Sequence, residues 1–395
     1  MREHEAVVVG CGSAGLSAAA KLKACGFEVA LIERGEAVGM RWRGRYEGLR
    51  LNTMGRFSSL PGYRIPRRLG RYVRREDFVG YLEEYANHHR LSIDYGVELE
   101  RVERDDGRWR LRTSAESLLA RYAVIATGYD AVPKLPEWPG RDAFAGELLH
   151  AADFRAPGAY RGREVLIIGA GNSGIDIAGH LIAAGARVSL SARTPPNIFP
   201  RDWGPIPLQP LAILGERQPA KLADTVGFLL QRMIFGDLTA HGMPQPSEGY
   251  ESKFRRTLVG AAVDDGFVAS LKAGRTEVVA PVDRFDVREV VLADGTLLTP
   301  DCVICATGYA RGLEGLVGEL GVLRPDGLPI CYGAAPEHPS APRLYFAGFW
   351  GSNGGQIRWS PIHARRIARA ALRDRREASA RQQPRRRRRK AFNDQ

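Results

Sequence analysis

The chain has 395 residues, of which 44% are hydrophobic and 26% are charged, so it is long enough for two globular domains of ordinary size. No apolar run approaches the ~20 residues that a membrane-spanning helix needs. The N-terminus passes from charged residues directly into a strand pattern, so we expect no secretory signal peptide.

The net charge of +12 is concentrated at the C-terminus, because residues 371–395 contain ten basic and three acidic side chains. The run Arg385–Lys390 could contact nucleic acid or an anionic membrane. We interpret residues 373–395 instead as a basic, disordered, solvated tail, and we expect no specific nucleic-acid partner.

The five cysteines are scattered along the chain and form neither a disulfide framework nor a metal-binding pattern, so a reducing, cytoplasmic location and no metal site are expected. Cys302 and Cys305 have the spacing of a redox pair but lie within an apolar strand pattern. Residues three apart in a strand point to opposite faces, so we expect these thiols to be buried and unpaired.

The first glycine-rich segment follows the apolar run Ala6–Val9 and opens a helical pattern over about residues 14–25. A strand, a tight glycine turn and a helix place the pyrophosphate of a dinucleotide at the helix N-terminus. The residues that we expect to bind this cofactor are Gly10, Gly12, Ser13, Ala14 and Gly15. A second strand ends at Glu33, the spacing at which an acidic residue accepts hydrogen bonds from a ribose, and Arg34 follows it.

A second segment of the same kind follows Val165–Ile168 and opens a helix predicted over about residues 172–184. Its expected cofactor-binding residues are Gly169, Gly171, Asn172, Ser173 and Gly174. The next strand ends in Arg193 and Thr194, without an acidic residue at the position of Glu33. A cation there fits a 2′-phosphate, which favours NADPH over NADH. Two dinucleotides in one protein indicate electron transfer between them, so FAD and NADPH are the predicted cofactors.

Two nearly identical strand ends and a third glycine segment are expected beside the cofactors. The expected residues are Thr127 and Gly128 in the first strand end, Thr307 and Gly308 in the second, and Gly348 and Phe349 in the third segment. The chain is therefore predicted to be an α/β protein with two Rossmann-like domains. Residues 1–157 and 281–372 are expected to form a discontinuous FAD-binding domain, and residues 158–280 an NADPH-binding domain. Within the second, a proline-rich insertion over about residues 195–250 is expected to shape a pocket.

Several further segments resemble the motifs of flavin-containing monooxygenases, a class B flavoprotein family. Phe144–Phe154 fits the family pattern F-x-G-x-x-x-H-x-x-x-[Y/F], with Phe144, Gly146, His150 and Phe154 at its fixed positions. Gly39–Trp42 is similar to the G-G-x-W segment, and Arg45–Thr53 is similar to the R-Y-x-x-L-R-L-x-T run of the YUCCA-like and bacterial branch.

This resemblance implies a glutathione-reductase-like arrangement of the two domains. It also implies that NADPH reduces FAD and that the reduced flavin captures O₂ as a C4a-hydroperoxyflavin, which transfers one oxygen atom to a small organic substrate. Asn52 falls at the position of the family asparagine that acts beside the flavin, Trp42 becomes a candidate for the cofactor wall, and the motif around His150 becomes a linker between the domains. A homodimer is a family-level expectation.

Alternatives remain open at this point. The oxygenation could take place at nitrogen or sulfur, or could decarboxylate a 2-oxo acid. A Baeyer–Villiger monooxygenase would use the same oxidant, but such enzymes end the linker motif in tryptophan, where this chain has Phe154. A flavin-dependent disulfide reductase would need a cysteine pair beside the flavin, and a nucleic-acid-binding protein would need more basic surface than the tail alone provides.

Overall fold

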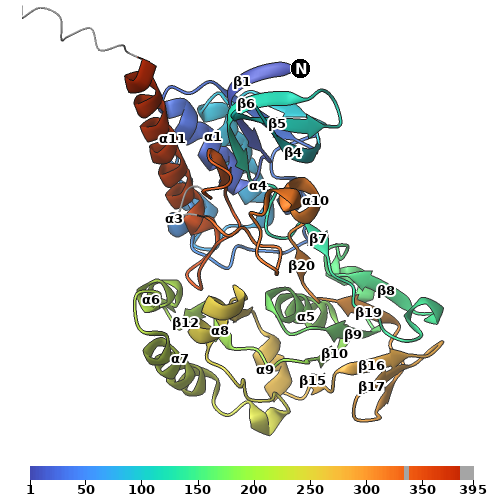
Figure 1. The fold of residues 1–395 in the computed structure, drawn as a ribbon. Coiled ribbons are helices and arrows are strands. Elements are labelled where there is room, and N and C mark those ends of the chain that lie inside the picture. Colours follow the sequence, from blue (N-terminus) through green and yellow to red (C-terminus); the bar gives the residue numbers. More distant parts are fainter. Residues whose placement is uncertain (333–337, 383–395) are drawn as a thin grey trace, which may run out of the picture.

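The computed structural model describes residues 1–332 and 338–382, which fold into two units, the first built on a mixed sheet and the second on a parallel sheet (Figure 1). The first sheet has the strand order β3-β2-β1-β6-β5-β4, and β21 pairs with β6. Its strands are β1 (Arg2–Val9), β2 (Val29–Glu33), β3 (Ile93–Tyr95), β4 (Leu99–Asp105), β5 (Arg108–Thr113), β6 (Leu118–Ile125) and β21 (Leu344–Phe346). The pairing of β1 with β2 and β6 is parallel, whereas β4, β5 and β6 form an antiparallel meander.

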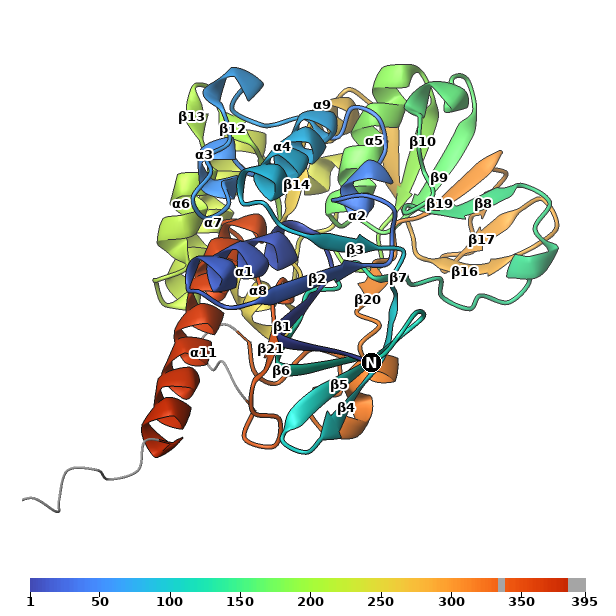
Figure 2. The same ribbon diagram turned by 90° about the horizontal axis from the view of Figure 1, so that it is seen from above.

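The first sheet is covered by α1 (Ser13–Ala24), α4 (Arg75–His88) and α11 (Ser360–Gln382), and Figure 2 shows α1 and α11 together beside β1 and β2. Small residues on α1, such as Ala18 and Ala19, are fully buried, and they allow its close approach to its neighbours. The shorter elements of this unit are α2 (Met40–Arg43), α3 (Gly55–Ser58), η1 (Arg67–Leu69), α10 (Glu314–Val317), η5 (Gly318–Leu320) and η6 (Ile357–Trp359). The ribbon of β7 (Val132–Pro133) and β20 (Tyr309–Ala310) lies between the two units.

The second sheet is parallel throughout and has the order β15-β10-β9-β19-β8. Its strands are β8 (Glu147–His150), β9 (Glu164–Ile168), β10 (Arg187–Ser191), β15 (Thr276–Val279) and β19 (Cys302–Cys305), and α5 (Asn172–Ala184) follows β9. A small antiparallel sheet of β16 (Val282–Phe285), β17 (Val290–Leu292) and β18 (Leu297–Leu298) extends from it, beside η2 (Arg141–Ala143). The turn η3 (Pro157–Tyr160) precedes β9.

The segment between β10 and β15 is mostly helical. It contains α6 (Gln209–Gly215), α7 (Ala220–Phe235), η4 (Thr239–His241), α8 (Tyr250–Thr257) and α9 (Phe267–Lys272). Two short pairs accompany these helices, β11 (Ile198–Pro200) with β14 (Ala262–Asp264), and β12 (Asp202–Trp203) with β13 (Ile206–Pro207). The expected insertion over about residues 195–250 is therefore part of a longer segment that reaches α9.

The expected domain boundaries at residues 157 and 281 differ from the strand pairing. β8 lies before residue 157 and β19 lies after residue 281, yet β19 pairs with both β8 and β9 inside the second sheet. The chain therefore enters the second unit about ten residues earlier than predicted and leaves it after β19. Strand pairing is a long-range property, and the local pattern around these strands did not reveal it.

The prediction of a disordered tail from residue 373 is wrong for residues 373–382, which form the last turns of α11. Asp374 fixes this end of the helix, because its carboxylate accepts hydrogen bonds from Tyr122, Arg121 and Arg343 at 2.7–3.0 Å. The remainder of the predicted tail, residues 383–395, lies outside the described residues. Within the described part of the chain, no helix combines the length and the apolar character needed to cross a bilayer.

Candidate active site

The first glycine turn has the geometry that a dinucleotide requires. Gly10 has a φ of 101°, and a Cβ on Gly15 would lie 1.8 Å from the carbonyl oxygen of Gly10, so both positions need glycine. A Cβ on Gly12 would meet nothing within 4 Å. No side chain caps the N-terminus of α1. The first backbone N–H groups of the 12-residue helix are therefore free of a side-chain cap, which fits a pyrophosphate at this end.

The predicted neighbours of this turn gather around it. The Oγ1 of Thr127 is buried and has no hydrogen-bond partner within the described protein, as expected of a hydroxyl that serves a bound group. Gly348 lies so close to the turn that its Cβ would be 2.8 Å from the Cβ of Ala14. Ser13 is within 3.4 Å of the Ser360 hydroxyl at the start of α11. Phe349 is fully buried, so its side chain is part of the core.

Glu33 lies at the end of β2, as the ribose-binding prediction requires. Its carboxylate accepts hydrogen bonds from the backbone N–H groups of Cys11 at 2.7 Å and Gly35 at 3.0 Å, which orient it beside the glycine turn. Arg34 is exposed and forms an ion pair with Glu98 at 3.5 Å.

Trp42 packs edge-on against Phe78 of α4, with ring centroids 4.9 Å apart, at the margin of the first core. This packing against the core is sufficient to explain why a tryptophan stands at this position. Its role in a cofactor wall stays a prediction.

The second glycine turn repeats the first. Gly169 has a φ of 110°, and a Cβ on Gly174 would lie 1.8 Å from the carbonyl oxygen of Gly169. A Cβ on Gly171 would again meet nothing within 4 Å, and no side chain caps α5. The second strand end lies beside this turn, because the Gly169 Cβ would be 2.5 Å from the carbonyl oxygen of Ala306. The residues that follow are Thr307, which donates to the backbone oxygen of Lys134, and Gly308, whose φ is 87°.

Arg193 and Thr194 are both exposed just beyond β10, and Ser173 lies in the first turn of α5. Arg193 forms no ion pair within the described residues, so its guanidinium is available to a phosphate. This placement fits the 2′-phosphate prediction. Both turns therefore have room and donors for a dinucleotide.

Asn52 lies where the two units meet. Its Nδ2 donates to Oδ1 of Asn172 at 3.3 Å, and its Oδ1 accepts from Nη2 of Arg201 at 3.1 Å. Asn172 also donates to the carbonyl of Ala261 at 3.1 Å and accepts from the N–H of Val263 at 2.9 Å. The predicted catalytic asparagine is thus in direct contact with the second glycine segment.

Arg201 was not predicted from the sequence. Its side chain is only 8% exposed and lies between Asn52 and two carboxylates, Asp265 and the buried Asp176 of α5, the latter at 3.5 Å. Asp176 also accepts a hydrogen bond from Tyr46. Burial and the neighbouring carboxylate raise the pKa of Tyr46 well above its ordinary value, so the phenol stays protonated and donates.

Gln209 of α6 is a second residue that the sequence did not predict. Its Oε1 accepts from the N–H of Met54 at 2.7 Å, and its Nε2 donates to the carbonyl of Gly354 at 2.7 Å. It therefore joins the insertion to two segments of the first unit. No sequence motif surrounds Arg201 or Gln209. Their partners lie far away in the sequence and come close only when the chain folds.

The predicted linker motif occupies β8 and the turn after it. His150 is buried; its Nδ1 accepts from the N–H of Ala152 at 3.0 Å, so its Nε2 carries the proton and donates to the carbonyl of Gly308 at 3.1 Å. Burial lowers the pKa of His150, which favours this neutral form. His150 therefore joins β8 to the second strand end.

The aromatic residues of the motif are packed. Phe154 is fully buried against Tyr46 and Tyr160, and Phe144 packs on Phe285. The ring of Phe144 covers Gly146 so closely that a Cβ there would lie 2.5 Å from it.

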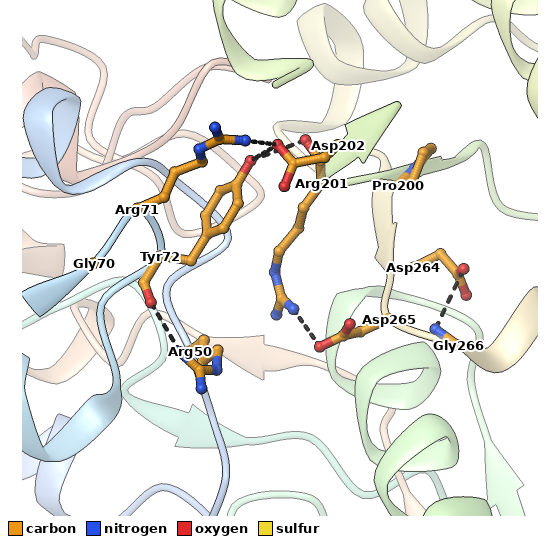
Figure 3. Close-up of a pocket in the computed structure, with 10 residues that line it drawn as sticks. All are labelled: Arg50, Gly70, Arg71, Tyr72, Pro200, Arg201, Asp202, Asp264, Asp265 and Gly266. Atoms are coloured by element: carbon orange, nitrogen blue, oxygen red, sulfur yellow. Dashed lines mark hydrogen bonds and ion pairs between the residues drawn. The ribbon is translucent and has the colours of Figure 1, made fainter. Parts of the chain in front are cut away.

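A cleft of about 590 Å³ opens next to Arg201, between the two units (Figure 3). Arg71 and Tyr72 on one side both reach Asp202 on the other, at 3.0 and 2.7 Å. Arg50 also lines the cleft, and within the described residues its guanidinium has no carboxylate partner; it donates to the carbonyl of Tyr72 at 3.3 Å.

The two cysteines of β19 do not form a redox pair. Cys302 and Cys305 are both fully buried and belong to hydrophobic clusters on different faces of the sheet. Burial raises the pKa of each thiol to about 12, so neither is a thiolate at neutral pH. This confirms the expectation that they are buried and unpaired.

The chain is similar to known proteins over most of its length. Residues 7–199 match the family model of pyridine nucleotide-disulphide oxidoreductases. Probable indole-3-pyruvate monooxygenase YUCCA3 of Arabidopsis thaliana is 30% identical over 339 residues, which cover 82% of this chain and 77% of that protein.

Two solved structures share the fold. A variant of a flavin monooxygenase from Stenotrophomonas maltophilia is similar with a TM-score of 0.72 and 24% identity, covering 96% of this chain and 100% of that one. The bacillithiol disulfide reductase of Staphylococcus aureus is similar with a TM-score of 0.70 and 20% identity, covering 95% and 99%. The fold therefore includes both oxygenases and reductases.

Two glycine turns of this geometry, each after a strand with parallel neighbours and with a polar contact between them, define a two-dinucleotide flavoprotein oxidoreductase. The sequence identity narrows the class. The chain belongs to the class B flavin-containing monooxygenases and is a YUCCA-like member, an oxidoreductase that depends on NADPH and O₂.

Proposed function

We propose that the first glycine turn binds FAD, that the second binds NADPH, and that the protein uses both with O₂ to oxygenate a small organic substrate. Oxidative decarboxylation of a 2-oxo acid is the leading reaction. The observation that carries this proposal is the 3.3 Å contact between Asn52 and Asn172, because it brings the residue beside the expected flavin to the turn that would hold the nicotinamide cofactor. The relatives named as indole-3-pyruvate monooxygenases supply the substrate class.

Separate sets of residues would bind the two cofactors. The N-terminus of α1 and the carboxylate of Glu33 would hold the pyrophosphate and ribose of FAD, and the N-terminus of α5 and Arg193 would hold those of NADPH and its 2′-phosphate. The bound flavin would supply the redox chemistry with O₂. Asn52 would orient groups between the cofactors, since its amide is held from both sides by Asn172 and Arg201.

The position of Arg50 supports the proposal that the substrate is an anion. Arg50 lines the cleft beside Arg201 and lacks a carboxylate partner within the described chain, whereas Arg71 and Arg201 are both paired with aspartates. A guanidinium binds a carboxylate through two parallel hydrogen bonds. Arg50 would therefore hold the carboxylate of a 2-oxo acid.

The alternatives predict other products. Oxygenation at nitrogen or sulfur would need no carboxylate, and a Baeyer–Villiger reaction would turn a ketone into an ester. A disulfide reductase would need two thiols in contact, and the positions of Cys302 and Cys305 on different faces of β19 do not support one.

The test supplies the FAD-loaded protein with NADPH and ¹⁸O₂, together with phenylpyruvate, an uncharged sulfide or a cyclic ketone in parallel. The proposal expects CO₂ release and one ¹⁸O atom in the acid formed from phenylpyruvate. Replacing Arg50→Gln should raise KM for phenylpyruvate about tenfold or more, whereas the exposed Arg56→Gln should leave it unchanged. NADPH oxidation that yields no labelled product from any substrate would overturn the proposal.

A further inference from the structure

The helix α7 presents an apolar stripe to the outside of the molecule. Leu222, Val226, Leu229 and Met233 are between 51% and 60% exposed. Their spacing of four, three and four residues places them on one face of the helix. Most exposed apolar side chains on a protein are isolated, so a continuous stripe of four is a feature that needs an explanation.

The opposite face of α7 fixes this orientation. Ala223 and Gly227 are buried, and a Cβ on Gly227 would lie 2.5 Å from the ring of Tyr250 in α8. Asp224 also points to α8, where it accepts hydrogen bonds from the backbone N–H groups of Glu251 and Ser252 at 2.7 and 3.3 Å. The helix therefore cannot turn its leucines inward without losing these contacts.

Neighbouring elements enlarge the stripe into a surface. Leu211 and Leu214 of α6 are 48% and 61% exposed. Trp203, Ile206 and Phe228 are exposed as well, but the first two lie on the β12–β13 pair and Phe228 on another side of α7. We call Leu211, Leu214 and the four residues of α7 the apolar face.

The charges around the apolar face are mostly positive. Arg217, Lys221 and Arg232 are exposed along it. The two acidic residues between positions 203 and 233 are engaged elsewhere: Glu216 forms an ion pair with Arg358, and Asp224 binds the start of α8. One exposed acidic residue, Asp237, follows the end of α7 and lies near Arg232. An apolar helix face bordered mainly by cations is the pattern of helices that lie in the interface of an anionic membrane.

A second basic surface lies on the same side of the molecule. Arg365, Arg369, Arg373 and Arg376 are exposed along one face of α11. Both Figure 1 and Figure 2 show α6, α7 and α11 on the left side of the ribbon. In the sequence, α11 is followed by the run Arg385–Lys390. Clusters of arginine and lysine beside an amphipathic helix attract anionic headgroups.

We infer that this side of the protein docks on an anionic lipid surface, with the apolar face at the level of the headgroups and the arginines of α11 bound to phosphates. This inference does not depend on the reaction proposed above. A second copy of the chain is a poorer occupant, because a symmetric contact would place Arg217, Lys221 and Arg232 of both copies around the same patch. Nucleic acid would use the cations but would leave the leucines exposed to water.

The test is flotation of the full-length, FAD-loaded protein with vesicles of phosphatidylcholine alone or with 30% phosphatidylglycerol, a composition of about one anionic lipid in three. Binding is expected to the anionic vesicles and to weaken at high salt. The double variant Leu229→Glu with Met233→Glu should lower the partition coefficient about tenfold or more, because it removes two apolar side chains that would enter the membrane and adds two negative charges.

The matched control is Val287→Glu with Leu297→Glu, which changes two equally exposed apolar residues near β16–β18, away from this side. It should bind vesicles as the unchanged protein does, and both double variants should retain FAD and the same melting temperature. Equal vesicle binding by both double variants would overturn the inference. So would a dimer in sedimentation that the α7 variant converts to a monomer, or retention of the unchanged protein by duplex DNA but not by vesicles.

Discussion

The side chains of Asn52 and Asn172 are in contact although 120 positions separate them in the chain, with Nδ2 of Asn52 donating to Oδ1 of Asn172 at 3.3 Å. Asn52 belongs to the first unit, and Asn172 is the first residue of α5 in the second. The contact therefore connects the segment beside one glycine turn to the helix that begins at the other. A cofactor held at each turn would meet its partner near these two amides.

The substitution Asn52→Ala should leave NADPH oxidation in place but lower the transfer of oxygen to the substrate. The variant loses the amide between Asn172 and Arg201 but changes no residue of either glycine turn, so FAD content should stay the same. Loss of one such hydrogen bond corresponds to about a tenfold change in a rate or equilibrium constant. We expect the yield of oxygenated product per NADPH to fall by about that factor, with hydrogen peroxide making up the difference. Asn87→Ala, an exposed change on α4, is the control, and equal coupling in both variants would contradict the role of Asn52.

A substitution in one glycine turn should abolish the binding of one cofactor and leave the other cofactor bound. A Cβ at Gly15 or at Gly174 would lie 1.8 Å from a backbone oxygen, a clash that no rotamer relieves. Gly15→Ala should therefore yield protein without FAD, and Gly174→Ala should keep FAD but lose reduction by NADPH. Absorbance of the purified protein and anaerobic titration measure the two effects. Gly80→Ala in α4, where a Cβ meets nothing within 4 Å, should change neither; a Gly174→Ala protein still reduced normally would refute the assignment.

Cofactor preference should depend on Arg193. Because this exposed guanidinium lies beyond β10 where the 2′-phosphate is expected, Arg193→Ala should raise KM for NADPH by about 10–100-fold and leave KM for NADH unchanged. Arg187→Ala, at the other end of the same strand and bound to Glu164, serves as the control. Parallel increases for both nucleotides would argue against a phosphate contact.

Stability should fall at mildly acidic pH because of His363. This residue of α11 is buried, neither ring nitrogen has a partner within the described protein, and burial lowers its pKa to about 4. The unfolded chain protonates this ring near its ordinary pKa of about 6.5, so the contribution is complete above pH 6.5 and is lost as the pH falls towards 4. The loss is on the order of 3 kcal/mol.

Guanidinium unfolding at a series of pH values measures this contribution. His363→Leu should remove it, so the difference in unfolding free energy between the two proteins should change between pH 6.5 and 4 and stay constant above pH 7. A constant difference over the whole range would show that His363 is not the responsible group.

The sequence was sufficient where structure is local. The turns at Gly10 and Gly169 need positive φ and close backbone approach, and only glycine provides both, so their place and form were predictable. The 13-residue helix α5 begins and ends where its pattern indicates.

The sequence was insufficient where a contact joins residues that are far apart along the chain. β19 pairs with β8 across more than 150 positions, and no local pattern assigns that neighbour. The end of α11 resembled a solvated arginine tail because the bonds from Asp374 to Tyr122 and Arg121 are invisible in the local sequence. Arg201 belongs to the candidate site for the same reason, through its contact with Asn52.

We expect electrons to pass from NADPH through a flavin to O₂ at a site between the two units. The most direct measurement is anaerobic reduction of the FAD-loaded protein with NADPH, followed by rapid mixing with O₂ while the flavin absorbance is recorded. The account predicts two phases, the first proportional to O₂ concentration and the second independent of it and slowed by bound NADP⁺. A single O₂-dependent phase with immediate release of peroxide, together with two new free thiols after reduction, would contradict it.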